Sequence, residues 1–142
     1  MALRFLSPIH KASRQIGIYL ESGKGDHDLT NSESHILTYL RSYAPCSIGD
    51  LHKVFGYKRS TLTSLLDRLC EKGYAAREAD EHDRRTVILT LSRKGKALAD
   101  RINRRILEFE EAIRRQINGR DLEGFQTVMA AIASVTKVQL KP

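Results

Sequence analysis

The stretch Arg59-Ser-Thr-Leu-Thr-Ser-Leu-Leu-Asp-Arg-Leu-Cys-Glu-Lys-Gly73 has two chemically different sides. Its leucines recur at the i, i+3, i+4, i+7 spacing of an amphipathic helix, and Gly73 is a typical residue to end one. Between the leucines stand short hydroxyl side chains and arginines. The pattern predicts a helix over 59–72 that buries one side and presents a small, polar and basic surface on the other.

After Gly73 the hydrophobic period changes from 3.6 to 2. Residues 74–78 and 86–91 are short runs of this kind, and the second is rich in Thr, Val and Ile. The charged residues 79–85 lie between them. We therefore expect a β-hairpin directly after the helix, with these charges at its tip.

Two more helices are expected before Arg59. Thr30, followed three residues later by Glu33, fits a capping box and predicts a helix start. Ser47 can cap a short third helix that closes at Gly56. A short helix, a tight turn, an amphipathic helix and a hairpin together make a winged helix-turn-helix.

Helical patterns also flank this segment. Residues 3–20 have apolar positions at roughly helical spacing, and Ser92 can cap a long helix whose apolar stripe reaches Ile117. Asn118-Gly119 is expected to end that helix, and Asp121 to cap the last one. The predicted fold class is mainly α with a small β-hairpin wing, in the order α-α-α-α-β-β-α-α, within a single domain spanning residues 1–142.

The charge of the chain is concentrated in its middle. The 142 residues carry 24 Lys and Arg against 17 Asp and Glu, a net charge of +7. The whole excess of positive charge lies between His52 and Arg105. In the two flanks taken together, basic and acidic residues are equal in number. A basic centre between neutral ends indicates a module that binds a polyanion and is held by scaffolding.

Charge and helix pattern together predict a site for double-stranded DNA. An exposed polar helix can reach base edges in the major groove, short hydroxyls allow close approach to phosphates, and a basic hairpin tip can reach the neighbouring minor groove. Asp67 is expected to act as a structural brace that holds Arg85 and the wing. The candidate DNA-binding residues are Lys58, Arg59, Ser60, Thr61, Thr63, Ser64, Arg68, Arg84 and Arg85.

Several of these segments, in this order, resemble the MarR family of bacterial transcription regulators. The resemblance is carried by Leu29-Thr30 with Glu33, Ser47-Ile-Gly-Asp-Leu51, Arg59-Ser-Thr-Leu-Thr63, Leu66-Asp-Arg-Leu69 with Glu71-Lys-Gly73, Arg77 with Asp83-Arg-Arg85, Leu89-Thr-Leu-Ser92, and Lys94-Gly95. It covers residues 29–98 closely and the rest in outline.

The resemblance implies a homodimeric, sequence-specific transcriptional regulator. Residues of about 30–95 would form the DNA-binding part, and about 2–22 and 96–140 the dimerisation helices. Two winged lobes would read a pseudo-palindromic operator, usually as a repressor. A small aromatic or apolar anion would release the DNA from a pocket walled by the first helix and by residues 36–43.

Two positions depart from the family pattern. Ser64 stands where many members carry a basic residue after Thr-x-Thr, so a base contact from this position is in doubt. Lys58 occupies the usual helix-cap position although lysine is a poor cap, so Ser60 is expected to cap the helix instead.

Other classes of function have little support in the sequence. We find no nucleophile elbow, phosphate loop or strong metal-ligand spacing, so we expect neither an enzyme, nor a cofactor, nor a metal site. The short apolar runs and the two cysteines favour a cytoplasmic protein without a membrane span. Two alternatives stay open: a winged-helix module for RNA or protein interaction, and a regulator that senses oxidants through Cys46.

Overall fold

The computed structural model describes residues 2–22, 25, 27–138 and 140. Within them the chain forms six helices and three short strands, which confirms the predicted fold class of a mainly helical protein with a hairpin wing. The elements are α1 (Leu6–Ser22), α2 (Asn31–Tyr43), β1 (Cys46–Ser47), α3 (Ile48–Phe55), α4 (Arg59–Glu71), β2 (Ala75–Ala79), β3 (Val87–Leu91), α5 (Arg93–Arg114) and α6 (Gly119–Thr136).

Most helix ends follow the predicted capping chemistry. Thr30 and Ser47 each accept a hydrogen bond from a backbone N–H in a reciprocal capping box, and Gly56 closes α3 in the left-handed conformation. The start of α6 was predicted one turn too late. Asn118 is its N-cap, and Asp121 returns the hydrogen bond as the third helical residue, so the two side chains form one capping box.

A two-residue strand was not predicted from the sequence. The β1 strand pairs antiparallel with β3, placing Cys46 opposite Leu89, and β3 pairs with β2 to complete a sheet in the order β1-β3-β2. Two residues are too few to show a period of 2 in sequence. Their strand conformation comes from a partner more than forty residues away, so local pattern carries no signal for it.

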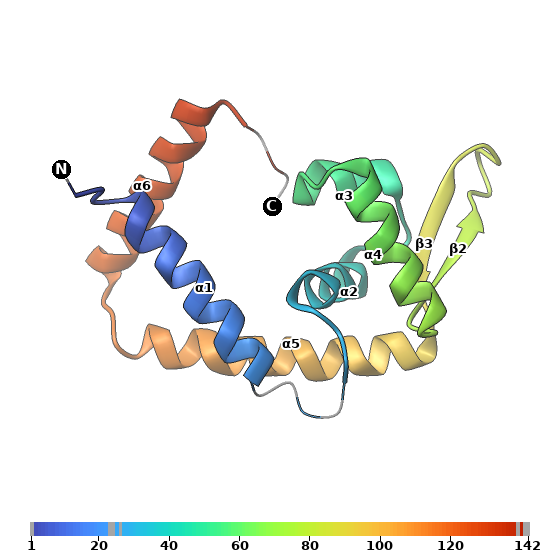
Figure 1. Cartoon of the computed structure of the whole chain (residues 1–142), viewed down its shortest axis with the longest axis horizontal. Helices are drawn as coiled ribbons and strands as arrows, with labels where there is room; N and C mark the ends of the chain where they lie inside the picture. Colours follow the sequence, from blue (N-terminus) through green and yellow to red (C-terminus); the bar gives the residue numbers. More distant parts are fainter. Residues whose placement is uncertain (1, 23–24, 26, 139, 141–142) are drawn as a thin grey trace.

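The core lies where α2, α3, α4 and the start of α5 meet the sheet. The four leucines of α4 are all buried, as predicted, together with Leu51 of α3 and Leu89 of β3. Burial of these side chains fixes which side of α4 is left for solvent. The helix therefore presents its hydroxyl and arginine side chains outward. Figure 1 shows α4 beside the hairpin.

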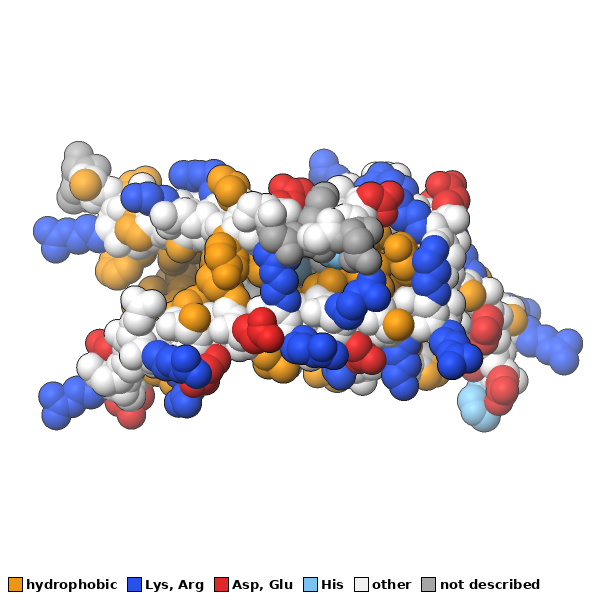
Figure 2. Space-filling model, turned by 90° about the horizontal axis from the view of Figure 1, so that it is seen from below, with side chains coloured by type: hydrophobic (Ala, Val, Ile, Leu, Met, Phe, Trp, Pro, Cys, Tyr) orange, Lys and Arg blue, Asp and Glu red, His pale blue; other side chains and the backbone are white. Residues whose placement is uncertain are grey.

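The remaining helices form a second region at the other end of α5. Figure 1 shows α5 running along the molecule, with α1 and α6 near its C-terminal half and the winged lobe near its N-terminal half. Neither α1 nor α6 has a fully buried residue. Figure 2 shows hydrophobic side chains gathered in a hollow toward the α1 and α6 end, and Lys and Arg spread along the molecule.

Candidate nucleic-acid interface

All nine predicted DNA-binding residues are exposed. Those of α4 follow its outward side, beginning with Arg59 at the first helical position, and those of the wing lie in the turn between β2 and β3. The helix of 13 residues is about 20 Å long. This length and its small side chains suit an element that must lie in a groove.

The first turn of α4 is not capped by a side chain. Lys58 is the N-cap residue, its backbone is extended, and no side chain accepts a hydrogen bond there. The prediction that Ser60 caps the helix is therefore wrong, since Ser60 lies inside the helix. The exposed N–H groups of this turn are oriented toward an incoming anion, as at other helix N-termini that bind phosphate.

A shallow open groove of about 500 Å³ lies next to this turn. It is formed by the start of α3, the start of α4 and the beginning of β3, next to the wing turn. Sequence reasoning missed three polar members of it, Ser47, His52 and Thr86, because they come from elements other than the amphipathic helix. The lining residues are Ser47, Ile48, Gly49, His52, Arg59, Leu62, Thr63, Thr86 and Val87.

Two aspartates shape the wing tip. Asp80 Oδ1 accepts a hydrogen bond from the N–H of His82 at 2.9 Å. Asp83 accepts one from the N–H of Arg85 at 3.0 Å and another from the Thr86 hydroxyl at 3.1 Å. These carboxylates fold the turn, so the guanidinium groups of Arg84 and Arg85 are presented on a defined loop.

Asp67 braces the wing through a different arginine from the one predicted. Its carboxylate accepts a hydrogen bond from Arg77 Nη2 at 2.6 Å, and α4 packs against β2 at this place. Arg85 lies at the far tip of the hairpin, away from the strand that packs on the helix. The predicted pairing of Asp67 with Arg85 is therefore wrong, while a tie between α4 and the wing is present.

Arg68 forms an ion pair with a buried carboxylate of the protein. Its Nε donates to Glu33 Oε1 at 2.6 Å, and Lys72 Nζ donates to Glu33 Oε2 at 3.3 Å. Burial of Glu33 opposes its ionisation, yet hydrogen bonds from Arg68, the Thr30 backbone and Lys72 hold the pKa of this carboxyl below its usual value. Arg68 is the one predicted DNA-binding residue that the described structure places in an ion pair.

Cys46 has the wrong environment for an oxidant sensor. Burial in the sheet, with a smaller contribution from the negative charge of Asp50, raises the pKa of its thiol to about 11. The thiol is therefore protonated at neutral pH, and the residue is only 7% exposed. Because oxidants react with an accessible thiolate, this environment does not support the alternative of an oxidant sensor at Cys46.

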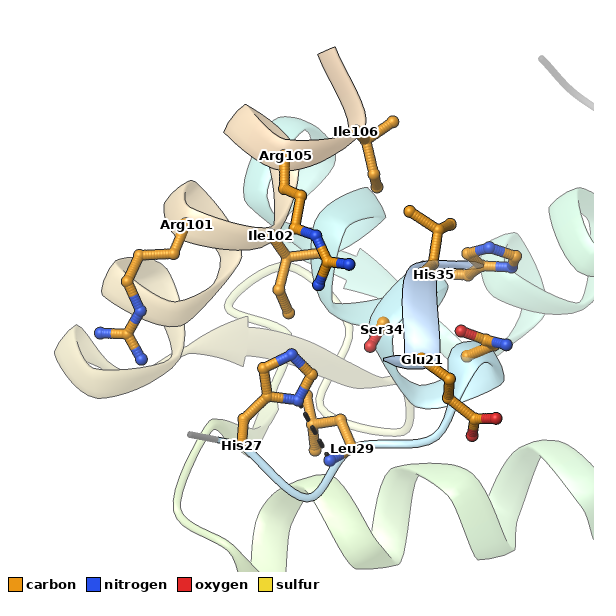
Figure 3. Close-up of a pocket in the computed structure, with 11 residues that line it drawn as sticks. Glu21, His27, Leu29, Ser34, His35, Arg101, Ile102, Arg105 and Ile106 are labelled. Carbon is orange, nitrogen blue, oxygen red and sulfur yellow. Dashed lines mark hydrogen bonds between the residues drawn. The ribbon is translucent and has the colours of Figure 1, made fainter. Parts of the chain in front are cut away.

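A separate pocket of about 180 Å³ lies between α1, α2 and α5 (Figure 3). Its α2 wall is the first turn of that helix, which corrects the predicted wall of residues 36–43. Figure 3 shows Arg105 extending from α5 toward the pocket between Ile102 and the α2 residues. The lining residues are Leu20, Glu21, His27, Leu29, Asn31, Ser34, His35, Arg101, Ile102, Arg105 and Ile106.

The pocket combines apolar walls with cationic groups. Leucine and isoleucine side chains supply the walls, and the guanidinium groups of Arg101 and Arg105 supply positive charge. Burial lowers the pKa of His35, so its imidazole is neutral at pH 7. The charge balance of the lining, two arginines against Glu21, favours a ligand that is apolar in body and negative at one end.

Comparison with known proteins shows a similarity to one family over part of the chain. Residues 27–86, which run from the segment before α2 to the end of the wing turn, match the model of the MarR family. This segment of the chain is similar to the MarR family. A relative from Bacillus subtilis (strain 168), the HTH-type transcriptional regulator YwhA, is 26% identical over 121 residues, covering 81% of this chain and 87% of the relative.

A second Bacillus relative matches a shorter stretch of the chain. The HTH-type transcriptional regulator YcgE is 43% identical over 58 residues, which are 39% of this chain and 38% of the relative. This match is more identical than that of YwhA but shorter. It is about as long as the segment that matches the MarR-family model.

Solved MarR-type structures share the fold along nearly the whole chain. MepR of S. aureus, solved with DNA, superposes with a TM-score of 0.85 at 20% identity, covering 94% of this chain and 99% of that one. FabT of Streptococcus pneumoniae, also solved with DNA, has a TM-score of 0.79 at 20% identity. The match covers 94% of this chain and 96% of FabT. PcaV of Streptomyces coelicolor, solved with its natural ligand, superposes with a TM-score of 0.76 at 18% identity. The match covers 96% of this chain and 99% of PcaV. At these identities the likeness shows the fold.

No helix in the described ranges combines the length and the apolar character required to cross a membrane.

Proposed function

We propose that this protein is a dimeric, sequence-specific transcriptional regulator that binds double-stranded DNA and acts as a repressor. The observation that carries the proposal is the exposed, hydroxyl-rich side of α4 beside a basic wing, in the part of the chain that holds all of the excess positive charge. MepR and FabT, which have this fold, are solved with DNA.

In this proposal α4 enters the major groove and reads the sequence. Arg59 and Thr63, near its N-terminal end, contact base edges, while the uncapped N–H groups of its first turn and the hydroxyls of Ser60 and Thr61 contact phosphates. The start of α3 and the beginning of β3 line the same groove of the protein and contact the flanking DNA backbone. Arg84 contacts phosphates or the minor groove.

Dimerisation follows from the apolar surface that one chain leaves uncovered. Phe125 of α6 is 59% exposed, and Leu107 and Ile113 of α5 and Ile117, between α5 and α6, are exposed with it. A monomer would carry a large apolar patch over α1, α5 and α6, which is unfavourable in water. A second copy of the chain, packed on these helices by a two-fold axis, buries the patch and presents two winged lobes to a pseudo-palindromic operator.

The proposed effector is a small aromatic or apolar anion that binds the pocket between α1, α2 and α5. The apolar walls match its body, and Arg105 matches its negative end. A thermal-shift screen of phenolic and other aromatic carboxylates tests this part. We expect at least one to raise the melting temperature and to weaken DNA binding, with both effects reduced in Arg105→Ala. A screen without any shift would contradict a carboxylate effector.

The DNA-binding function is tested by selection from a random duplex library with the purified protein. We expect an inverted repeat to be enriched, and the enriched duplex to bind at least a hundredfold more tightly than random duplex or RNA of equal length, in line with specific regulators. Equal affinity for all three polyanions would support the winged-helix RNA or protein module instead, and would contradict sequence-specific regulation.

A further inference from the structure

One carboxylate joins the start of α2 to the end of α4. Glu33 is 1% exposed, in the first turn of α2. Its Oε1 accepts from Arg68 at 2.6 Å, and its Oε2 accepts from Lys72 at 3.3 Å and from the N–H of Thr30 at 3.2 Å. The charge is thus compensated by two cations of α4 and by a backbone group.

The two cations are one helical turn apart on α4. Residues separated by four positions lie on the same side of a helix, so Arg68 and Lys72 reach Glu33 together. The side chain of Lys72 also donates to the carbonyl of Asp28 at 3.4 Å, and the backbone carbonyl of Lys72 accepts from Lys94 of α5 at 3.0 Å. The C-terminal end of α4 is therefore tied to the segment before α2 and to the start of α5.

Burial makes this connection sensitive to the loss of either partner. A carboxylate that is almost completely removed from water is costly to leave unpaired, so the arrangement of α2 and α4 that keeps all three contacts is strongly preferred. Moving the end of α4 by one or two ångströms would break contacts at Glu33. The side chain consequently fixes how α4 projects from the lobe.

We infer that Glu33 is a positioning residue for DNA recognition, and that Arg68 acts through Glu33 and not as a contact to DNA. The inference rests on the proposed function, because α4 is the element that reads the operator. It removes Arg68 from the set of DNA-contacting residues and assigns a positioning role to Glu33, which the sequence pattern indicates only as a helix cap.

The inference also connects the pocket to the reading helix. Leu29, Asn31, Ser34 and His35 flank Glu33 in sequence and line the pocket, and Asn31 Nδ2 donates to the carbonyl of Gly17 in α1 at 3.0 Å. The same turn of α2 thus has one side on the pocket and the other on α4. A ligand that displaces this turn acts on α4 through Glu33.

The test compares Glu33→Gln, Arg68→Ala and the double variant on the selected duplex across a range of salt concentrations. We expect each single variant to weaken binding about three- to thirtyfold, and the double variant to be no weaker than the poorer single variant. The slope of log K against log salt should equal that of the wild type, because no phosphate contact is lost. Glu111→Gln, which alters an exposed carboxylate paired with Arg114 and Arg115, should change neither quantity.

A direct role of Arg68 on DNA predicts the opposite pattern. Arg68→Ala would then reduce the salt slope by about one unit, and Glu33→Gln would strengthen binding by freeing the guanidinium for a phosphate. Either result would overturn the inference. The side chain of Arg68 is 46% exposed, so Arg68→Ala is expected to fold and distinguishes the two roles even if Glu33→Gln does not fold.

Hydrogen exchange in the absence of DNA separates this inference from the proposed function. We expect both single variants to speed amide exchange in the last turn of α4 and the first turn of α2, without a comparable change in α6. Unchanged exchange would contradict the positioning role. If the wild type binds no duplex, the proposed function fails, but this measurement still decides whether Glu33 holds α4.

Discussion

Among the residues that the structure describes, Glu33 is the one charged side chain that is almost fully buried, and its ionisation should be visible in stability. Its folded-state pKa lies below the ordinary value of 4.5. The contribution of the ionised carboxylate is therefore fully present above about pH 4.5, and it is lost as the pH falls through the folded-state pKa.

The prediction compares the free energies of unfolding of wild type and Glu33→Gln from urea titrations between pH 3 and pH 7. We expect the variant to be less stable by about 1–3 kcal/mol at pH 7, because charge-assisted hydrogen bonds are lost. The difference should shrink below pH 4.5. A difference that stays constant down to pH 3 would show that the carboxylate charge has no part in it.

Arg59 and Arg84 are exposed arginines with different expected roles. Arg59 lies at the start of α4, and Arg84 lies in the wing turn. Arg59→Ala should cost about 1–3 kcal/mol of binding free energy and relax the preference at one or two base pairs in each half-site. Arg84→Ala should weaken all duplexes similarly and reduce the salt slope by about one unit.

Fluorescence anisotropy with the selected duplex and with single-base variants of it checks this contrast. The two substitutions remove the same kind of side chain, so each variant is the control for the other. If Arg59→Ala left the ranking of duplex variants unchanged, α4 would not read bases through this residue.

At the scale of single residues, the sequence predicts which side chains of α4 are exposed, but not which side chains form ion pairs with one another. The outward position of Arg59 and Thr63 follows from the leucine spacing, because the helix period alone decides which side is buried. The partners of Asp67 and Arg68 depend on which strand and which helix pack on α4. That information is tertiary, so the predicted brace was assigned to Arg85 when the geometry gives Arg77.

The contact between α4, the hairpin and α5 depends on one glycine. A β-carbon added at Gly95, near the start of α5, would lie 1.8 Å from the carbonyl oxygen of Tyr74. The clash is with backbone, and the same carbonyl accepts a hydrogen bond from the N–H of Ser92. The helix start is therefore held against the chain between α4 and β2, and moving either side away would break this hydrogen bond.

Gly95→Ala should destabilise the protein by about 1–3 kcal/mol or more, because the methyl group forces these elements apart. Gly119→Ala, at the first position of α6, is the matched control: a β-carbon there meets nothing within 4 Å, so the change should be neutral or stabilising by less than about 1 kcal/mol. Thermal and urea denaturation measure both. Equal stability of the two variants would contradict the close packing at Tyr74.

At the scale of elements, helices were predictable where a cap and a hydrophobic period coincide. Thr30, Ser47 and Ser92 were recognisable as N-caps because the residues that satisfy the first turn lie within three positions. The start of α6 was misjudged because Asn118 and Asp121 are both good caps, and their reciprocal use is visible only in the structure. Strand β1 depends on its distant partner in β3.

The whole molecule has two ends with different surfaces. The winged lobe buries a continuous core, whereas α1 and α6 bury no residue completely within one chain. Phe125 and Thr127 are two residues apart on α6, so they lie on nearly opposite sides of that helix. Only the side of Phe125 continues the apolar stripe that the proposed dimer would bury.

Phe125→Asp should therefore shift the protein toward monomer, because it places an unpaired charge in the contact between copies. Since Phe125 is already 59% exposed in one chain, the fold of each protomer should survive. Thr127→Asp introduces the same charge on the other side and should leave the assembly unchanged. Sedimentation velocity at micromolar concentration gives both results, and a monomeric wild type would contradict the proposed dimer.

At this largest scale the resemblance to the MarR family implies a pocket, but the expected α2 wall differs from the one in the structure. The expected wall of residues 36–43 belongs to the half of α2 that turns into the core, where Ile36, Leu37 and Leu40 are buried. The α2 residues that line the pocket, Asn31, Ser34 and His35, lie nearer the N-terminal end of the helix. Which turn of a helix borders a cavity depends on how three helices cross. The hydrophobic period of one helix does not predict that crossing.

The central claim is that two winged lobes, related by a two-fold axis, read one operator. Hydroxyl-radical footprinting of the wild-type protein on the selected duplex tests it most directly. We predict two protected clusters, symmetric about the centre of the inverted repeat and about 10–10.5 base pairs or a multiple of this apart, on one face of the duplex. A single asymmetric cluster, or uniform weak protection along the whole duplex, would contradict the claim.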